Sequence, residues 1–236
     1  MNRLEPTSNR TAWSQYGIEE VIALMRALSE AEGLLWVDEH LLVLDKPAGL
    51  LAVPGRGEDK QDCLSLRAQR LWPDARVVHR LDMATSGLFV MARGAATQRA
   101  LSRAFEERAV DKRYEAIVHG AIAGNAGEIA LPLMADWPNR PLQKVDAEQG
   151  RPSVTRWRVI ERLADRTRLA LEPVTGRTHQ LRVHLQAIGH PILGDALYAP
   201  ADVQALAPRL LLHACALQLA HPATGEALAF QSPAPF

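Results

Sequence analysis

The stretch His79-Arg80-Leu81-Asp82-Met83-Ala84-Thr85-Ser86-Gly87 is the most informative part of the sequence. It sets one carboxylate beside cationic or ionisable neighbours, and a Thr-Ser-Gly turn follows. The apolar run over residues 88–92 comes next and predicts a buried strand. A carboxylate on a tight turn at the mouth of a buried strand is anchored from below and presented to solvent, as an active-site group must be. The alternative, from composition alone, is that Asp82 only caps the turn and Arg80 is a surface charge.

The length and composition describe a chain that can bury one sizeable core. The 236 residues are 47% hydrophobic and 23% charged, which is typical of a soluble globular enzyme. The 27 basic and 27 acidic residues cancel, which argues against a protein that coats nucleic acid by bulk electrostatics. A local basic groove within a neutral chain is still compatible with RNA binding.

The sequence lacks the signals that mark several other classes of protein. No apolar run approaches the roughly 20 residues of a membrane span, and residues 1–8 lack the apolar core of a signal peptide, so we expect a cytoplasmic protein with no membrane partner. Cys63 and Cys215 each stand alone, which argues against a disulfide framework or a zinc knuckle. His179 and His184 are five residues apart and fall on different faces of a helix or strand, so we expect no metal. Glycine-rich nucleotide motifs and a serine-hydrolase elbow are absent, so we expect no cofactor.

Hydrophobic spacing predicts alternating strands and helices through the chain. Helical spacing is expected over residues 17–28, 63–71 and 95–109, and strands over 34–37, 41–44, 88–92 and 112–118. Residues 154–161 and 167–172 predict a second hairpin, and 210–214 and 217–220 predict final strands before a proline-broken tail. This irregular mixture without a βαβ rhythm favours an α+β fold with a largely antiparallel sheet.

Two segments carry polar groups that suggest a binding surface. Residues 132–152 read as a proline-braced loop with Trp137, which either lies against nucleic acid or pins the loop to the core. A helix is expected from about residue 177 to Ile188, ended by Gly189. On that helix His179, Arg182 and Gln186 would share one face.

The chemistry available to Asp82 is that of a lone carboxylate. Without metal or cofactor, such a group can be a covalent nucleophile or an acid or base at a sugar carbon. Glycosidases use two carboxylates across the bond, whereas this stretch offers one beside cations. A paired arginine favours the ionised form, which suits a nucleophile better than a general acid.

The central stretch also resembles the signature of the RluA-type pseudouridine synthases, with Asp82 at the position of the catalytic aspartate. Further motifs follow in family order and cover roughly residues 33–236. They are Lys46-Pro47-x-Gly49-Leu50, Lys112-Arg113-Tyr114, Arg-Thr-His-Gln-Leu-Arg-Val-His over 177–184, Gly-His-Pro-Ile-Leu-Gly-Asp over 189–195 and Leu-Leu-His-Ala over 211–214. The sequence departs from the family at Asp45, where its members carry asparagine.

The resemblance implies a cofactor-free enzyme that converts uridine in RNA to pseudouridine after flipping the nucleotide out of its stack. It implies that Asp82 is the essential aspartate and that Arg182 pairs with it. Tyr114 would stack on the base and help to remove the C5 proton, and Arg80 would fill the space left by the flipped nucleotide. The other expected substrate contacts are His79, Arg177, His179 and Leu181.

The resemblance also bears on domains and substrate. Residues 1–32 would form a tail with a short helix, too short for the S4 domain of many relatives, and 33–236 the catalytic domain. Residues 136–141 and 208–214 are most similar to the family's dual-specificity member, which acts on large-subunit rRNA and tRNA anticodon stem-loops. We therefore expect a monomer acting on one or both RNAs. The alternatives are an RNA-binding protein of this fold without turnover and a glycoside-cleaving hydrolase.

Overall fold

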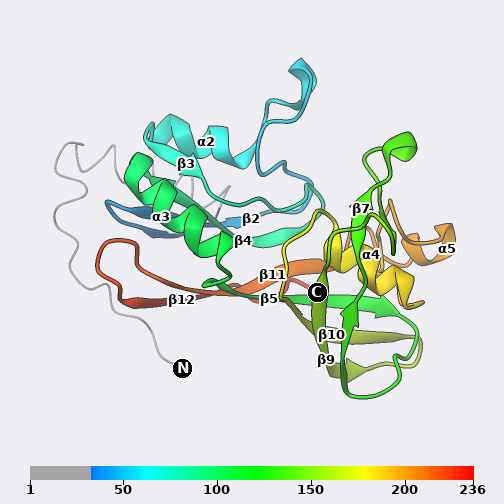
Figure 1. Ribbon diagram of the computed structural model, residues 1–236. Helices are drawn as coiled ribbons and strands as arrows, with labels where there is room; N and C mark the ends of the chain where they lie inside the picture. The colour runs from blue at the N-terminus through cyan, green and yellow to red at the C-terminus, as the bar shows by residue number, and fades with distance from the viewer. Residues whose placement is uncertain (1–32) are drawn as a thin grey trace.

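A ten-stranded sheet runs through residues 33–236, the part of the chain that this computed structural model describes (Figure 1). Its strands are β1 (Leu34–Val37), β2 (Leu41–Lys46), β3 (Ala75–Val77), β4 (Ser86–Arg93), β5 (Asp111–His119), β6 (Ala126–Ala130), β9 (Val154–Arg162), β10 (Arg166–Pro173), β11 (Leu212–Ala220) and β12 (Ala227–Gln231). Their order is β1-β2-β4-β11-β5-β10-β9-β6, with β3 on β4 and β12 on β11. Only the β4–β11 pair is parallel among these strands, so the expected α+β fold with a largely antiparallel sheet is confirmed.

Four α-helices, two 3₁₀ turns and a separate hairpin complete the described chain. They are α2 (Leu64–Leu71), α3 (Gly94–Glu106), α4 (Gln180–Ala187), α5 (Ala201–Gln204), η1 (Glu58–Lys60), η2 (Trp137–Asn139) and the hairpin of β7 (Leu133–Ala135) with β8 (Gln143–Val145). Helix α3 packs on β3 and β4, whereas α4 packs against β8, β9 and β10. The helices therefore cover different parts of the sheet (Figure 1). No helix within residues 33–236 is long and apolar enough to span a membrane.

The central strands β2 and β4 are buried on both faces. Leu42 and Phe89 belong to the core cluster under α2, whereas Leu41 and Val90 belong to the cluster under α3. Successive side chains of a strand point to opposite faces, so a strand covered on both sides needs an unbroken apolar run. The run at 88–92 is explained in this way, and the expected buried strand is confirmed.

Gly87 lets the start of β4 approach β11 closely. Its φ is +111°, and an added Cβ would lie 2.4 Å from the carbonyl oxygen of Ala214. No side chain fits there, which explains the glycine in the Thr-Ser-Gly turn. The turn that carries Asp82 is thus fixed at its downstream end by the parallel pair.

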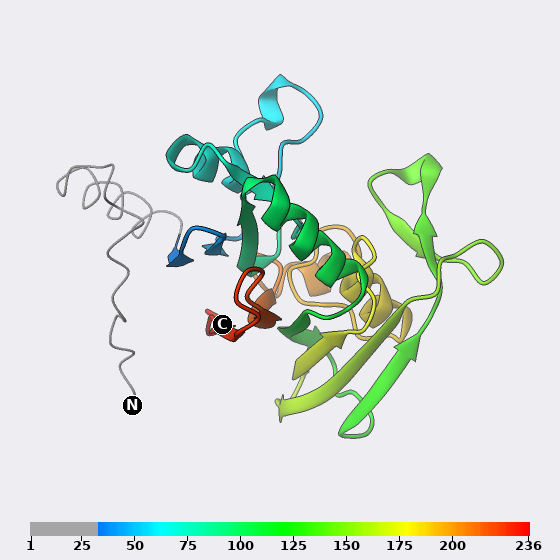
Figure 2. The same ribbon diagram turned by 60° about the vertical axis from the view of Figure 1, so that its left-hand side comes forward.

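Three expectations about elements need correction, and a fourth lies outside the described residues. Residues 132–152 are not wholly loop, because the β7–β8 hairpin lies within them and projects from the body of the molecule (Figure 2). The two final strands are one strand, β11, whose apolar pattern is interrupted where its register with β5 shifts between Ala214 and Ala216. The tail expected to be broken by proline contains β12. The helix expected over residues 17–28 lies outside the described residues.

Candidate active site

A cleft of about 600 Å³ lies between the C-terminal end of α3 and the N-terminal end of α4. All eight residues that the sequence singled out for the site line it, from segments that are far apart in the chain. They are His79, Arg80, Asp82, Tyr114, Arg177, His179, Leu181 and Arg182. The fold therefore brings the predicted set together in one place.

Arg182 joins two carboxylates at the base of this cleft. Its Nη1 lies 3.3 Å from Asp82 Oδ2, while its Nε and Nη2 donate to the two oxygens of Asp195 at 2.8 and 2.6 Å. Burial would lower the pKa of Arg182, but the hydrogen bonds and charges of Asp195 and Asp82 outweigh it and raise that pKa. Arg182 is therefore a permanent positive charge beside Asp82.

Asp195 is a site residue to which sequence reasoning gave no role. It is fully buried, and its Oδ1 also accepts the backbone N–H groups of Leu197 and Tyr198 at 2.9 and 3.2 Å. These bonds fix the carboxylate, which in turn fixes the guanidinium plane of Arg182. The available signal was its place at the end of the family motif over 189–195.

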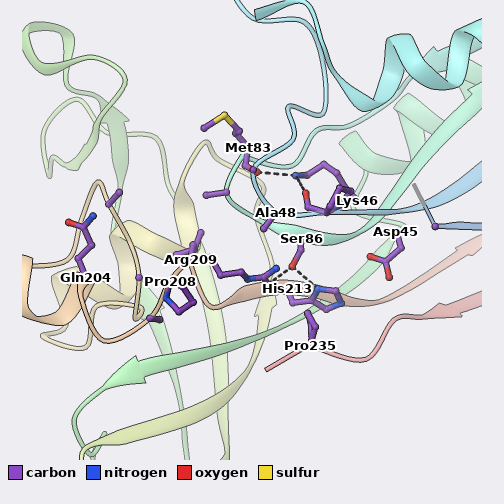
Figure 3. A pocket seen from close by; sticks show the side chains of 18 of the residues that line it. Asp45, Lys46, Ala48, Met83, Ser86, Gln204, Pro208, Arg209, His213 and Pro235 are labelled. Atoms are coloured by element: carbon purple, nitrogen blue, oxygen red, sulfur yellow. Dashed lines mark hydrogen bonds between the residues drawn. The ribbon is translucent and has the colours of Figure 1, made fainter. Parts of the chain in front are cut away.

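The turn carrying Asp82 is held from behind by a buried cation (Figure 3). Lys46 Nζ donates to the carbonyl oxygens of Pro47, Leu50 and Met83 at 2.7, 2.8 and 3.1 Å. The Met83 carbonyl also accepts the N–H of Gly49. Burial lowers the pKa of Lys46 to about 8. Three bonds to carbonyl groups compensate for burying this ammonium, so the residue after Asp82 is tied to the end of β2.

His179 reaches the site by a different route from the one expected. It precedes α4 as the N-cap residue with φ +54°, so it does not lie on the helix, and Gln186 is exposed and outside the cleft. The expected shared face of these residues with Arg182 is therefore wrong. His179 Nε2 lies 3.8 Å from Asp82 Oδ1, and its Nδ1 lies 2.6 Å from the hydroxyl of Tyr198. Burial lowers the pKa of His179, against the opposing charge of Asp82.

Tyr114 stands in the middle of β5, between its partners on β10 and β11. It packs against two of the core clusters and lines the cleft. Burial raises the pKa of its phenol, and the charge of Asp82 adds to the rise. Tyr114 is therefore a neutral phenol at physiological pH.

The remaining predicted contacts differ in exposure. Arg80 and Arg177 are exposed cations on the cleft, whereas Leu181 is almost buried in the core cluster beneath α4. The ring of His79 stacks on Phe105, with centroids 4.6 Å apart, and its Nε2 accepts the backbone N–H of Val90 at 2.9 Å. His79 therefore supports the wall of the cleft.

A second cavity of about 990 Å³ lies beside the turn that carries Asp82 and is lined by Met83, Ser86 and Arg209 among others (Figure 3). Ser86 Oγ accepts from Arg209 Nη2 at 2.8 Å and lies 2.9 Å from His213 Nδ1.

The same hydrogen-bond chain continues to β2. His213 Nε2 lies 2.9 Å from Ser232 Oγ, whose hydroxyl donates to the Asp45 carboxylate. The aspartate that departs from the family's asparagine thus has a hydrogen-bond donor as its partner.

The fold is that of RNA pseudouridine synthases whose structures have been solved. The sequence profile of the RNA pseudouridylate synthase family matches residues 40–187. The chain belongs to this family, and it isomerises uridine in RNA to pseudouridine. The membership expected from the sequence motifs is confirmed.

Among its relatives is the dual-specificity RNA pseudouridine synthase RluA of Escherichia coli K12, which is 52% identical over 204 residues, 86% of this chain and 93% of the relative. The protein of the same name from Vibrio cholerae is 49% identical over 189 residues, 80% of this chain and 77% of the relative. Two solved human structures are similar. RNA pseudouridylate synthase domain containing 1 has a TM-score of 0.73 at 29% identity, covering 88% of this chain and 85% of its own. RNA pseudouridylate synthase domain containing 4 has a TM-score of 0.71 at 27% identity, covering 90% of this chain and 92% of its own.

Proposed function

We propose that Asp82 is the catalytic carboxylate of this isomerisation and that Arg182 and Tyr114 act with it. The observation that carries the proposal is the buried guanidinium of Arg182, which Asp195 holds in place 3.3 Å from the Asp82 carboxylate. No other carboxylate lining the cleft within the described residues has a cationic partner, since Glu106 makes no ion pair there.

The reaction needs an ionised carboxylate at the ribose. In the isomerisation the N1–C1′ bond breaks, the uracil turns, and C5 bonds to C1′. The proton on C5 then leaves and N1 takes one up, so the atoms balance without a cofactor. Attack of Asp82 on the ribose and removal of a ribose proton by Asp82 are both open to an ionised carboxylate. The positive charge of Arg182 favours that form in either route.

The cleft can receive the uridine only after the nucleotide leaves its stack. Extrusion costs roughly a few kcal/mol, and loops and bulges lower that cost. In the proposal Tyr114 stacks on the flipped uracil and its neutral phenol assists loss of the C5 proton. Arg80, exposed at the mouth of the cleft, fills the place that the nucleotide leaves. His79, Arg177, His179 and Leu181 complete the substrate contacts, as the cleft lining supports.

The proposed substrates are uridines in large-subunit rRNA and in tRNA anticodon stem-loops. Two observations support them: the similarity to relatives named dual-specificity RNA pseudouridine synthase, and the likeness of residues 136–141 and 208–214 to that member of the family. In this proposal residues 33–236 form the catalytic domain, which acts in the cytoplasm as a monomer, without metal.

The test is tritium release from [5-³H]uridine-labelled rRNA and tRNA transcripts, with wild type beside Asp82→Asn. We expect wild type to release tritium and the variant to lose at least about a thousandfold in rate, as for removal of a nucleophile, while its RNA affinity is kept. Comparison of the transcripts names the substrate. Turnover by the variant at the wild-type rate would refute the role of Asp82. Release of free uracil in place of tritium would identify a glycoside-cleaving hydrolase.

A further inference from the structure

The α3 end of the cleft holds two cations that the catalytic proposal does not use. Arg108 and Lys112 line the same cleft as Asp82. Neither side chain makes an ion pair or a hydrogen bond within residues 33–236. Glu106 lines this end as well, but it forms no ion pair with either of them. At this end of the substrate cleft, neither positive charge therefore has an ion-pair partner among the described residues.

Lys112 is only partly exposed, so its unpaired charge is unusual. Its Nζ lies 5.8 Å from the centroid of the Phe105 ring, and a Cβ added to Gly176 would lie 4.0 Å from the same nitrogen. The ammonium thus reaches across toward the wall that carries Arg177. Burial lowers the pKa of Lys112, the positive charge of Arg108 lowers it further, and the negative charge of Asp111 opposes both. The charge of an anion bound here would favour the protonated form of Lys112.

Arg108 occupies a backbone position that favours glycine. The C-terminus of α3 ends in a Schellman motif, with Arg108 N–H donating to Phe105 O and Ala109 N–H to Ala104 O. The residue at the left-handed position of this motif is usually glycine, yet here it is an arginine with φ +60°. Such an outlier beside a ligand cleft suggests that the side chain is kept for a function at the expense of stability.

A simpler explanation is that these cations only complement the dipole at the end of α3. That explanation predicts side chains bonded to the last carbonyl groups of the helix, and no such bond is present within the described residues. It also gives no reason for the cleft to contain the side chains. We propose that Arg108 and Lys112 form a binding site for a backbone phosphate of the RNA substrate, beside the nucleotide whose uridine reaches Asp82.

The test measures how RNA binding depends on salt. Each lost phosphate contact lowers the slope of log Kd against log salt concentration by about 0.7 to 0.9. We expect Arg108→Gly and Lys112→Met each to lower the slope by this amount. RNA affinity at low salt should fall about five- to tenfold, with the loss of turnover appearing in KM rather than kcat. The probe is whichever stem-loop transcript wild type binds more tightly, measured by fluorescence anisotropy.

The control is Arg103→Met, which removes the same charge from an exposed position of α3 outside the cleft. It should leave the slope and the affinity at wild-type values. Arg108→Gly adds a second readout, because glycine suits the left-handed position: its melting temperature should not fall below that of wild type while its RNA affinity drops. If either cleft variant keeps the wild-type slope, as Arg103→Met does, the phosphate site is refuted.

The inference rests on RNA being the substrate, and it can fail separately from the proposed role of Asp82. Binding needs no turnover, so the measurement is repeated on the Asp82→Asn background. A lowered slope there supports the phosphate site whatever the tritium experiment shows. An unchanged slope in both backgrounds overturns it even where Asp82 proves catalytic.

Discussion

Arg182 is the residue on which the geometry of the site depends most. Its two hydrogen bonds to Asp195 fix the plane of the guanidinium. The orientation of its Nη1 toward the Asp82 carboxylate is therefore fixed as well. A lysine could not do this, because an ammonium is a point charge without a planar fork. The buried carboxylate of Asp195 is therefore as much part of the site as the arginine that it holds.

Tyr114 gives a prediction at the same scale. Its raised pKa keeps the phenol neutral, so the hydroxyl can assist loss of the C5 proton only as a relay, which takes up that proton while it passes its own to an acceptor. We expect Tyr114→Phe to keep RNA affinity, because the ring still stacks, and to lose about a hundredfold in kcat, as for removal of an acid–base group. A single-turnover assay with 5-deuterated uridine should show a larger isotope effect in the variant. A kcat within twofold of wild type would leave the hydroxyl without a role.

The β7–β8 hairpin is the element with the clearest prediction of its own. The sequence left two interpretations of Trp137, and its side chain is 63% exposed, so it does not pin the hairpin to the core. The guanidinium carbon of Arg140 lies 3.4 Å from the centroid of its ring. This pair offers a stacking face and a positive charge together, which is what unpaired bases and their phosphates bind.

We expect Trp137→Ala to weaken binding of a stem-loop transcript by about 1 to 3 kcal/mol, the usual value of one base stacked on an aromatic ring. Filter binding measures this, and thermal unfolding should be unchanged because the ring is exposed. Leu163→Ala is the matched control, since Leu163 is 44% exposed and lies between β9 and β10. Equal affinities of the two variants would mean that the hairpin does not contact RNA.

Strands whose apolar side chains are continuous or alternate regularly along the chain were predictable from the sequence. The run at 88–92 and the alternation of β9 and β10 became strands as expected. The misses occur where tertiary contacts override the local pattern. The register shift at Cys215 divides the apolar pattern of β11, and the left-handed backbone of His179 removes that residue from α4. Local spacing contains neither signal.

The candidate site was predictable as a set of residues but not as an arrangement. Motifs named Asp82 and Arg182, which are 100 residues apart, and the structure places them 3.3 Å apart. Asp195 had no role in the prediction because an aspartate after a turn is common. Its importance follows only from the burial that surrounds it and from the guanidinium that it holds.

At the scale of the whole molecule, folding buries a histidine in its neutral form. Burial, with help from the charge of Lys112, lowers the pKa of His79 from 6.5 to about 3. In the unfolded chain the same imidazole takes up a proton near pH 6.5. Between these values the unfolded state binds more protons, so the stability of the fold is lost as the pH falls below about 6.5.

His79→Gln should isolate this contribution, because glutamine keeps a neutral acceptor for the Val90 N–H and does not titrate. Other histidines with lowered pKa values, among them His184 and His213, act in both proteins and cancel in the comparison. We expect the free energy of unfolding of wild type to fall between pH 7 and pH 5 by about 1 to 2 kcal/mol more than that of the variant. Urea unfolding followed by tryptophan fluorescence gives both values. Parallel pH profiles would contradict this prediction, because the His79 imidazole would then take up its proton as readily in the folded protein as in the unfolded chain. In that case its stacking on Phe105 would not keep the imidazole neutral.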